Sequence, residues 1–350
     1  MHLARQPLRL TPALTQLALT RFVLPRQASG RPASRCTTPC LASVTMVQYF
    51  EGERASSKGH KLLSVTYLPE AAAGPPSAVL LFHHGISEHI GRYKSIFERF
   101  AEAGIAVYSG DIVGHGRSEG HRALVENIND TADEMLALAQ FAKEDVQKRF
   151  PGAPLPPMFI GGHSLGGLIA AMACQRDQSR WSGLLLSSPA LDVEMGPVLR
   201  IQAALGGLLA AVVPKARIVP AVDPTDMIPD ASLVEMYSAD PLNTVGNLPA
   251  RTGNEILKGM RGLRPHWPSF KLPLYIHHGD SDKCTSAPAS QAFFAAAASP
   301  DKKLELVEGG YHELMFTPGV SDVLVSGMIE WITQRAAVGA TAVGSGAAKM

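Results

Sequence analysis

Short apolar runs alternate with longer segments of helical periodicity through most of the chain, and this alternation restricts the possible folds more than any other feature. The apolar runs predict strands, at residues 78–84, 105–109, 158–161, 183–187, 272–277 and 304–308. The longer segments predict helices, at residues 93–103, 128–150, 166–175, 288–298 and 320–335. Strands that alternate with helices form a mostly parallel sheet covered on both faces, so the sequence predicts an α/β fold.

One turn between a predicted strand and a predicted helix carries a candidate nucleophile. Residues 162–166 read Gly-His-Ser-Leu-Gly, which fits the Gly-x-Ser-x-Gly nucleophile elbow. The pattern alone is weak because glycine and serine are common, but the strand before it and the helix after it make it specific. Such a turn strains Ser164 and places its hydroxyl at a helix N-terminus, where developing negative charge is favoured.

A serine hydroxyl needs a general base, and the base needs an acid that orients it. In this architecture the acid and the histidine follow the serine in that order. Asp280 and Asp282 follow the predicted strand 272–277, and His312 follows the strand 304–308 after two glycines. We expect His312 to be the base and prefer Asp282 as the acid, with Asp280 as the alternative that we interpret as a turn residue.

The end of the first predicted strand is a candidate oxyanion hole. The sequence His83-His84-Gly85-Ile86 lies there. We expect the backbone N–H of Ile86 and that of Leu165 to bind the substrate carbonyl oxygen as its negative charge develops. The alternative is an ordinary turn at the end of a strand.

Three segments fall outside the alternation. Residues 1–45 contain six arginines, nine serines and threonines and no acid, which is typical of an organelle transit peptide. The alternative is a disordered extension with translation from Met46. The proline-rich residues 190–270 are expected to form a lid (cap) over the C-terminal edge of the sheet, and residues 337–350 a disordered tail.

The predicted α/β core therefore consists of residues 46–189 and 271–336, with the lid inserted between them. A transit peptide implies a plastid or a mitochondrion. Without one, we expect a cytoplasmic protein that is peripheral to membranes.

Charge and composition exclude several functions. Lys and Arg total 32 and Asp and Glu total 31, so the net charge of +1 gives no electrostatic basis for binding nucleic acid. The four cysteines show no spacing typical of a metal site, and we predict no metal and no cofactor. No run reaches the roughly 18 apolar residues of a spanning helix. The nearest, residues 197–213, predicts transient contact of the lid with a membrane surface, with packing against the core as the equal alternative.

Six sequence words resemble the monoacylglycerol lipase family, which also includes plant caffeoylshikimate esterases and lysophospholipase-like enzymes. They are HHGISEHIGRY (83–93), GDIVGHGRSEG (110–120), GGHSLGG (161–167), YSADPL (237–242), HHGDSDKC (277–284) and EGGYHEL (308–314). The resemblance covers residues from about 62 to 335 and implies the α/β-hydrolase fold. It also places Ser164, Asp282 and His312 at the positions of the family's catalytic triad, and Ile86 and Leu165 at its oxyanion positions.

By the same resemblance, substrate contact is expected at four further residues: Glu88, Arg92, Tyr237 and His163. Glu88 and Arg92 match residues near the alcohol part of the ester, and an internal ion pair that braces the loop is the equal alternative. One position departs from the lipases, because Met315 stands where another histidine commonly follows the catalytic one.

These features predict a serine hydrolase that cleaves carboxylic esters through an acyl-enzyme. The leading substrate is a monoacylglycerol, and a lysophospholipid or a phenolic ester such as caffeoylshikimate is the alternative. A non-catalytic ligand-binding protein of the same fold is the alternative of another class. The expected partner is a small-molecule or lipid ester, and the sequence makes no prediction of oligomeric state.

Overall fold

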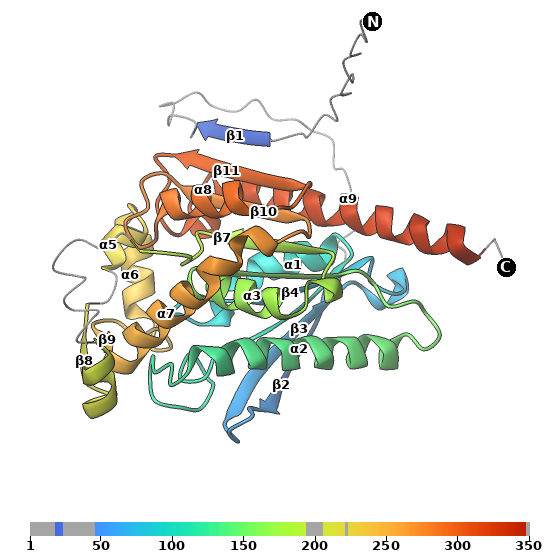
Figure 1. The fold of residues 1–350 in the computed structure, drawn as a ribbon. Coiled ribbons are helices and arrows are strands. Elements are labelled where there is room, and N and C mark those ends of the chain that lie inside the picture. Colours follow the sequence, from blue (N-terminus) through green and yellow to red (C-terminus); the bar gives the residue numbers. More distant parts are fainter. Residues whose placement is uncertain (1–17, 24–45, 194–205, 221–222, 348–350) are drawn as a thin grey trace, which may run out of the picture.

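A nine-stranded, mostly parallel sheet with helices on both faces forms the centre of the computed structural model, which confirms the predicted α/β fold (Figure 1). The structure describes residues 18–23, 46–193, 206–220 and 223–347. The strand order is β1-β11-β10-β7-β6-β4-β5-β3-β2, and only β3 runs antiparallel to its two neighbours among these described strands. From β4 the chain continues to β5 on one side of it, whereas β6 lies on the other side and is followed by β7. The connections that leave β4 and β6 therefore diverge, and a crevice forms between the C-terminal ends of these two strands.

The elements of this core have the following bounds. The strands are β1 (Ala18–Val23), β2 (Gln48–Ala55), β3 (Lys61–Leu68), β4 (Ala78–His83), β5 (Ile105–Gly110), β6 (Met158–His163), β7 (Gly183–Ser187), β10 (Leu274–Gly279) and β11 (Lys302–Glu308). The covering helices are α1 (Lys94–Glu102), α2 (Ile128–Arg149), α3 (Leu165–Arg176), α8 (Ala287–Ala296) and α9 (Ser321–Ala347).

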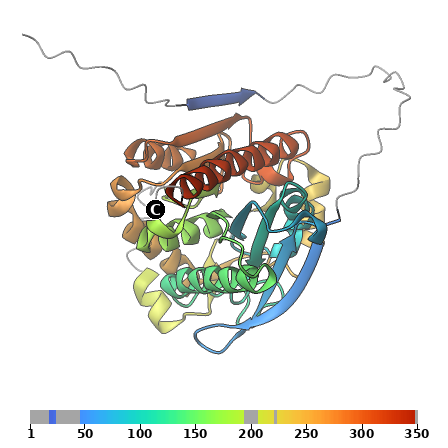
Figure 2. The same ribbon diagram turned by 90° about the vertical axis from the view of Figure 1, so that its right-hand side faces the viewer.

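Both faces of the sheet are buried, which explains why its central strands are continuously apolar. Side chains alternate between the two faces of a strand. In β4, Leu81 belongs to a buried cluster with side chains of α2, α3 and α8 on one face, whereas Leu80 and Phe82 belong to a cluster with side chains of α1 and α9 on the other. Figures 1 and 2 show these two helical layers. The alternation of elements in the sequence is therefore a direct consequence of this double burial.

The alternation of apolar runs and helical segments in the sequence did not predict β2 and β3, which form an antiparallel pair at one end of the sheet. Most residues of β2 are exposed, so this strand carries no apolar run. In β3 the buried positions include Ser64 and Thr66, which interrupt its apolar residues. A strand of either kind lacks the pattern by which the central strands were predicted.

Both termini differ from the prediction. Residues 18–23 form β1, which pairs in parallel with β11 at the outer edge of the sheet, so the prediction that residues 1–45 lie outside the fold is wrong for these six (Figure 2). Their sequence contains threonine, phenylalanine and valine, which favour strands, and β11 offers them an open edge. At the other end α9 continues to Ala347, so residues 337–347 are helical rather than disordered; their four alanines favour a helix, and their three glycines oppose it. Residues 1–17, 24–45 and 348–350 lie outside the described residues.

The chain between β7 and β10 first lies, in its described residues 206–220 and 223–249, beyond the C-terminal ends of the strands (Figure 1). It contains β8 (Arg217–Val219), α5 (Pro224–Met227), α6 (Ala231–Ala239), β9 (Leu248–Pro249), α7 (Ala250–Leu263) and a 3₁₀ helix (Arg264–Ser269). Helix α7 packs against α2 and α3 and so holds this segment to the core. Of the apolar run at 197–213, residues 206–212 are helical and residues 197–205 lie outside the described residues. Within the described residues, no helix is long and apolar enough to cross a membrane.

Candidate active site

Ser164 occupies a sharp turn between β6 and α3. Its backbone has φ 52° and ψ −117°, a left-handed conformation that strains a residue with a side chain. A Cβ on Gly162 would overlap the backbone of Gly166, and a Cβ on Gly166 would overlap the carbonyl oxygen of His83. The two glycines are therefore required because strand, turn and helix pass so close together. This is the geometry of a nucleophile elbow.

Asp282 and His312 are in direct contact, with 2.7 Å between the carboxylate Oδ2 and the ring Nδ1. The loops that carry them touch, because a Cβ on Gly279 would overlap the carbonyl oxygen of Gly310. Burial alone would raise the pKa of Asp282 and lower that of His312. The attraction between the two groups outweighs burial, so the pKa of Asp282 is lowered and that of His312 is raised.

Several groups besides His312 also hold Asp282 in place. Its Oδ1 accepts the backbone N–H groups of Cys284 at 2.7 Å and Thr285 at 3.0 Å. Its Oδ2 also accepts the Thr285 hydroxyl at 2.9 Å and lies 3.1 Å from Nε2 of the buried His278. These donors fix the carboxylate against His312.

The competing acid has a different environment. Asp280 Oδ1 accepts the backbone N–H of Gly309 at 2.8 Å and the Ser281 hydroxyl at 3.1 Å. Asp280 therefore ties the β10 loop to the β11 loop. Of the two aspartates, the structure places Asp282 against His312.

A pocket of about 480 Å³, including its open mouth, contains Ser164 and His312 together. It brings together most of the residues that the sequence singled out and adds several from the segment between β7 and β10. The lining comprises Gly85, Ile86, Ser87, Glu88, His163, Ser164, Pro224, Met227, Tyr237, Thr244, Val245, Leu248, His312 and Glu313. Arg92, Leu165 and Asp282 lie behind this lining rather than in it.

The loop after β4 holds one peptide group, that between Gly85 and Ile86, in a defined orientation. The ring of His84 is fully buried and its Nε2 accepts the backbone N–H of Ile112 at 3.0 Å. Its Nδ1 must therefore carry the proton, which it donates to the carbonyl oxygen of Gly85 at 2.7 Å. That carbonyl and the N–H of Ile86 belong to the same peptide group and point in opposite directions. Within the described residues, the N–H groups of Ile86 and Leu165 donate no internal hydrogen bond, so both are available to an oxyanion.

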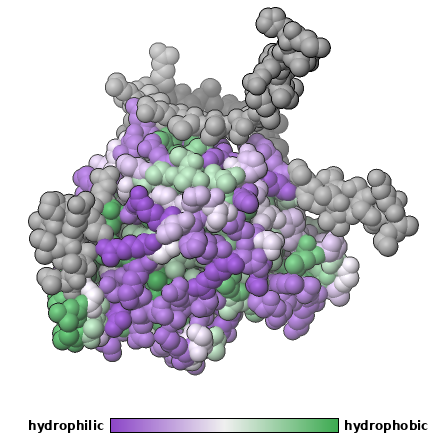
Figure 3. All heavy atoms as spheres, in the orientation of Figure 1, coloured by the Kyte–Doolittle hydropathy of each residue, from purple (hydrophilic) through white to green (hydrophobic). Residues whose placement is uncertain are grey.

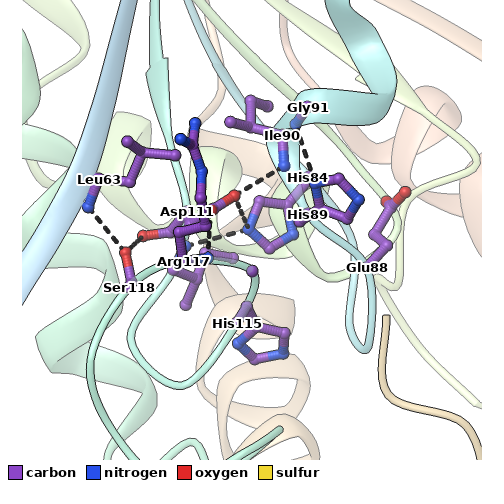
Figure 4. Close-up of polar contacts among 12 residues, drawn as sticks. Leu63, His84, Glu88, His89, Ile90, Gly91, Asp111, His115, Arg117 and Ser118 are labelled. Carbon is purple, nitrogen blue, oxygen red and sulfur yellow. Dashed lines mark hydrogen bonds and ion pairs between the residues drawn. The ribbon is translucent and has the colours of Figure 1, made fainter. Parts of the chain in front are cut away.

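Residues 110–120, one of the six sequence words, hold the loop after β4 in place. No such role was predicted for them from the sequence. Asp111 Oδ1 accepts the N–H of Ile90 and Oδ2 that of Arg117, both at 2.8 Å. Asp111 also lies beside the ring of His84, at 3.9 Å (Figure 4). The Ser118 hydroxyl donates to the carbonyl of Asp111 at 2.7 Å. Residues 110–120 therefore hold the loop after β4 at both its start, His84, and its end, Ile90; this loop is called the oxyanion loop below.

Arg92 lies between two buried carboxylates. Its Nη1 donates to Glu88 and, at 2.8 Å, to Oε1 of Glu313, while Nη2 donates to Oε2 of Glu313. The guanidinium also lies 4.8 Å from the ring centroid of Tyr237 and 4.3 Å from that of Phe316. Glu88 and Arg92 thus form the internal ion pair that was one of the two alternatives predicted from the sequence, and Glu88 also lines the pocket. This cluster of Arg92, Glu88 and Glu313 is called the brace below.

Burial and charge shift the pKa values of the two carboxylates of this brace in opposite directions. Burial would raise the pKa of Glu88, but Arg92 and nearby histidines bring the pKa to about 2. Burial raises the pKa of Glu313, against the pull of Arg92. Sequence reasoning missed Glu313, and the one available signal was an acid immediately after the candidate base.

The other expected substrate residues also have internal partners. The Tyr237 hydroxyl donates to the carbonyl of Ser87 at 3.1 Å, which ties α6 to the oxyanion loop. The ring of His163 lies 4.6 Å from that of His312, and burial lowers the pKa of His163 to about 3, so His163 is neutral. Met315, at the position that departs from the lipases, packs in the core beside α9.

Among the described residues, one group of side chains has metal-ligating atoms close together. The donor atoms of Asp282, Cys284 and His312 lie within 4.8 Å of one another. A cation there would have to break the bond between Asp282 and His312. The arrangement therefore suits proton transfer better than metal binding.

Comparisons with known proteins agree with this geometry. A profile of the family described as "Serine aminopeptidase, S33" matches residues 74–319. A monoacylglycerol lipase of Mycolicibacterium smegmatis is 31% identical over 259 residues, which are 73% of this chain and 88% of the relative. The monoglyceride lipase of Homo sapiens is 27% identical over 270 residues, 77% of this chain and 86% of the relative. The crystal structure of Paleococcus ferrophilus monoacylglycerol lipase shares the fold at 24% identity, with a TM-score of 0.67 over 78% of this chain and 99% of that one.

Proposed function

The chain belongs to the serine aminopeptidase S33 family and is an α/β-hydrolase of the monoglyceride lipase group, and from this premise we propose that it hydrolyses monoacylglycerols to glycerol and free fatty acid. The resemblance seen in the sequence words is thereby confirmed at the level of the family, and with it ester hydrolysis as the type of reaction.

In the proposed mechanism, Ser164 attacks the ester carbonyl while His312 Nε2 takes its proton. Asp282 keeps the proton of His312 on Nδ1, which leaves Nε2 free to act as the base. The N–H groups of Ile86 and Leu165 stabilise the negative oxygen of the tetrahedral intermediate. His312 then protonates the leaving alcohol, and the acyl-enzyme is cleaved by a water that His312 activates in the same way.

One observation carries the choice of monoacylglycerol. The pocket that contains Ser164 offers both the carboxylates of Glu88 and Glu313 and the apolar side chains of Met227 and Leu248. Carboxylate oxygens accept hydrogen bonds from hydroxyl groups, which suits glycerol. Apolar side chains suit a fatty acyl chain.

A turnover panel with purified protein tests this proposal. It compares monoacylglycerols of several chain lengths, lysophospholipids and phenolic esters, with the variant Ser164→Ala as the background. We expect the highest kcat/KM for a monoacylglycerol. A preference for lysophospholipids or for caffeoyl esters would select one of the alternative esterase functions. The absence of turnover on any ester would support the non-catalytic alternative.

We also infer that the segment between β7 and β10 touches lipid surfaces. Four aliphatic side chains at its tip, those of Leu208, Leu209, Val212 and Val213, are exposed, and Leu208 and Val212 are 64% and 70% accessible. Hydrophobic residues gather there in Figure 3, next to β8. Burying one such side chain in lipid contributes roughly 1.5–3 kcal/mol, so a few of them favour weak, reversible binding.

A further inference from the structure

The charges that face the pocket are predominantly negative. Among its described lining residues, Glu88 and Glu313 are acidic, and no lysine or arginine is present. Glu88 is 2% exposed and Glu313 is fully buried, so solvent screens neither of them well. A charged substrate group in this pocket therefore interacts electrostatically with two poorly screened carboxylates.

Arg92, the arginine that contacts these carboxylates in the described part of the chain, is not free to bind an anion. Both Nη atoms of Arg92 donate to Glu88 and Glu313, and the pairing with Glu313 is bidentate, as is typical of an ionised carboxylate. The rings of Tyr237 and Phe316 lie against the guanidinium. Its single positive charge offsets one of the two carboxylates and leaves the cluster with a net negative charge.

The histidines at the pocket do not reverse this balance. Burial lowers the pKa of His163 to about 3, so His163 carries no charge near neutral pH. His312 must be neutral to act as a base, and the charge of Asp282 lies directly behind it. Without a bound substrate, the site as a whole therefore has more negative than positive charge.

We propose that this pocket selects esters whose leaving alcohol is uncharged or cationic and rejects those with an anionic alcohol, and that Glu313 sets this preference. The inference rests on the proposed ester hydrolysis at Ser164, but not on glycerol being the alcohol. A neutral alcohol is not repelled by these carboxylates, whereas a phosphate or carboxylate on the alcohol meets like charges that the protein does not pair. Alcohols that carry a phosphate or a carboxylate are thus excluded from the substrate class.

Three butyrate esters of nearly the same shape test the charge preference in the wild-type protein. Their alcohols are 3,3-dimethylbutanol, which is neutral, choline, which is cationic, and 4-hydroxy-2,2-dimethylbutanoate, which is anionic. We expect kcat/KM for the neutral and cationic esters to exceed that for the anionic ester by roughly tenfold or more, as for a like charge in a poorly screened site. An anionic ester hydrolysed within about threefold of the neutral one would overturn the proposal.

The variant Glu313→Gln tests the assignment to one residue, because it removes the charge at nearly constant shape. We expect the ratio of anionic to neutral kcat/KM to rise roughly tenfold, whatever happens to the absolute rates. Glu308→Gln is the matched control, since Glu308 is exposed at the end of β11 and outside the pocket lining; its ratio should equal that of the wild type. An unchanged ratio in Glu313→Gln would refute the assignment to Glu313.

The two proposals can fail separately. The butyrate esters contain no glycerol, so a strong charge preference without turnover of monoacylglycerols would contradict the proposed function alone. Turnover of monoacylglycerols without a charge preference would contradict this inference alone. Should Glu313→Gln not melt cooperatively, the wild-type ratios still decide whether the charge preference exists.

Discussion

Replacing Asp282 with asparagine should disable the general base while leaving the shape of the site intact. Three donors converge on Asp282 Oδ2, from His312 at 2.7 Å, from the Thr285 hydroxyl at 2.9 Å and from His278 at 3.1 Å. An asparagine that keeps its oxygen on the backbone N–H groups of Cys284 and Thr285 presents an NH₂ group to these donors instead. His312 then relieves the conflict by moving its proton to Nε2, where it can no longer accept the proton of Ser164.

The expected loss follows from that change of tautomer. The corresponding substitution in a serine protease lowers kcat by roughly 10⁴, which is about 5.5 kcal/mol of barrier. The pH profile should change as well. Because Asp282 raises the pKa of His312, removing the carboxylate lowers that pKa and shifts the acidic limb of kcat/KM toward lower pH. A soluble aryl ester assayed from pH 5 to pH 9 measures both effects.

Asp280→Asn is the matched control for this experiment. An asparagine oxygen can still accept the N–H of Gly309, so we expect less than about a tenfold loss and no shift of the acidic limb. Asp280→Asn losing more activity than Asp282→Asn, with both variants folded, would refute the assignment of the acid.

Four further outcomes can be measured on the same protein. Ser164→Ala should lower kcat by roughly 10⁶ without changing the melting temperature, and more than a few per cent of residual turnover would rule out Ser164 as the nucleophile. His84→Gln should lower kcat by roughly tenfold or more with little change in KM, whereas His84→Asn, whose NH₂ group replaces Nδ1–H, should restore most of it; equal losses would argue against orientation of the Gly85–Ile86 peptide by His84. Leu208→Ser together with Val212→Ser should weaken liposome binding and long-chain turnover, measured against a short soluble ester that both forms hydrolyse equally. Deleting residues 1–45 should leave kcat/KM unchanged and lower the melting temperature by a few degrees, and an unchanged melting temperature would contradict the pairing of β1 with β11.

The parts of the site that could be predicted from the sequence lie at the ends of apolar strands. Parallel strands end at a common edge, so residues that follow β6, β10 and β11 are brought together whatever their distance along the chain. This is why Ser164, Asp282 and His312 could be predicted as a catalytic triad from the sequence. The choice of Asp282 over Asp280 rested on turn chemistry alone, and the contact with His312 now gives it a geometric basis.

The parts that could not be predicted depend on contacts between distant side chains. Arg92 meets Glu313 across 221 positions, and nothing in the pattern around either residue specifies the partner. The buried role of Asp111 likewise depends on where the chain of β4 passes. The residues of β1 favour a strand, but nothing in them specifies β11 as the partner, because a short strand gains its stability from the edge that it joins.

The pairing of the first strand with the last one of the sheet makes folding depend on the order of synthesis. Ala18 lies opposite Lys303, so 285 positions separate the two partners in the chain. At roughly 5–20 residues per second, a ribosome needs about 15–60 s to make β11 after it has made β1. During that interval β1 has no edge to join and remains open to any receptor or chaperone that binds extended chains. β1 can therefore pair with β11 only after β11 has been synthesised, and its backbone lacks that partner until then.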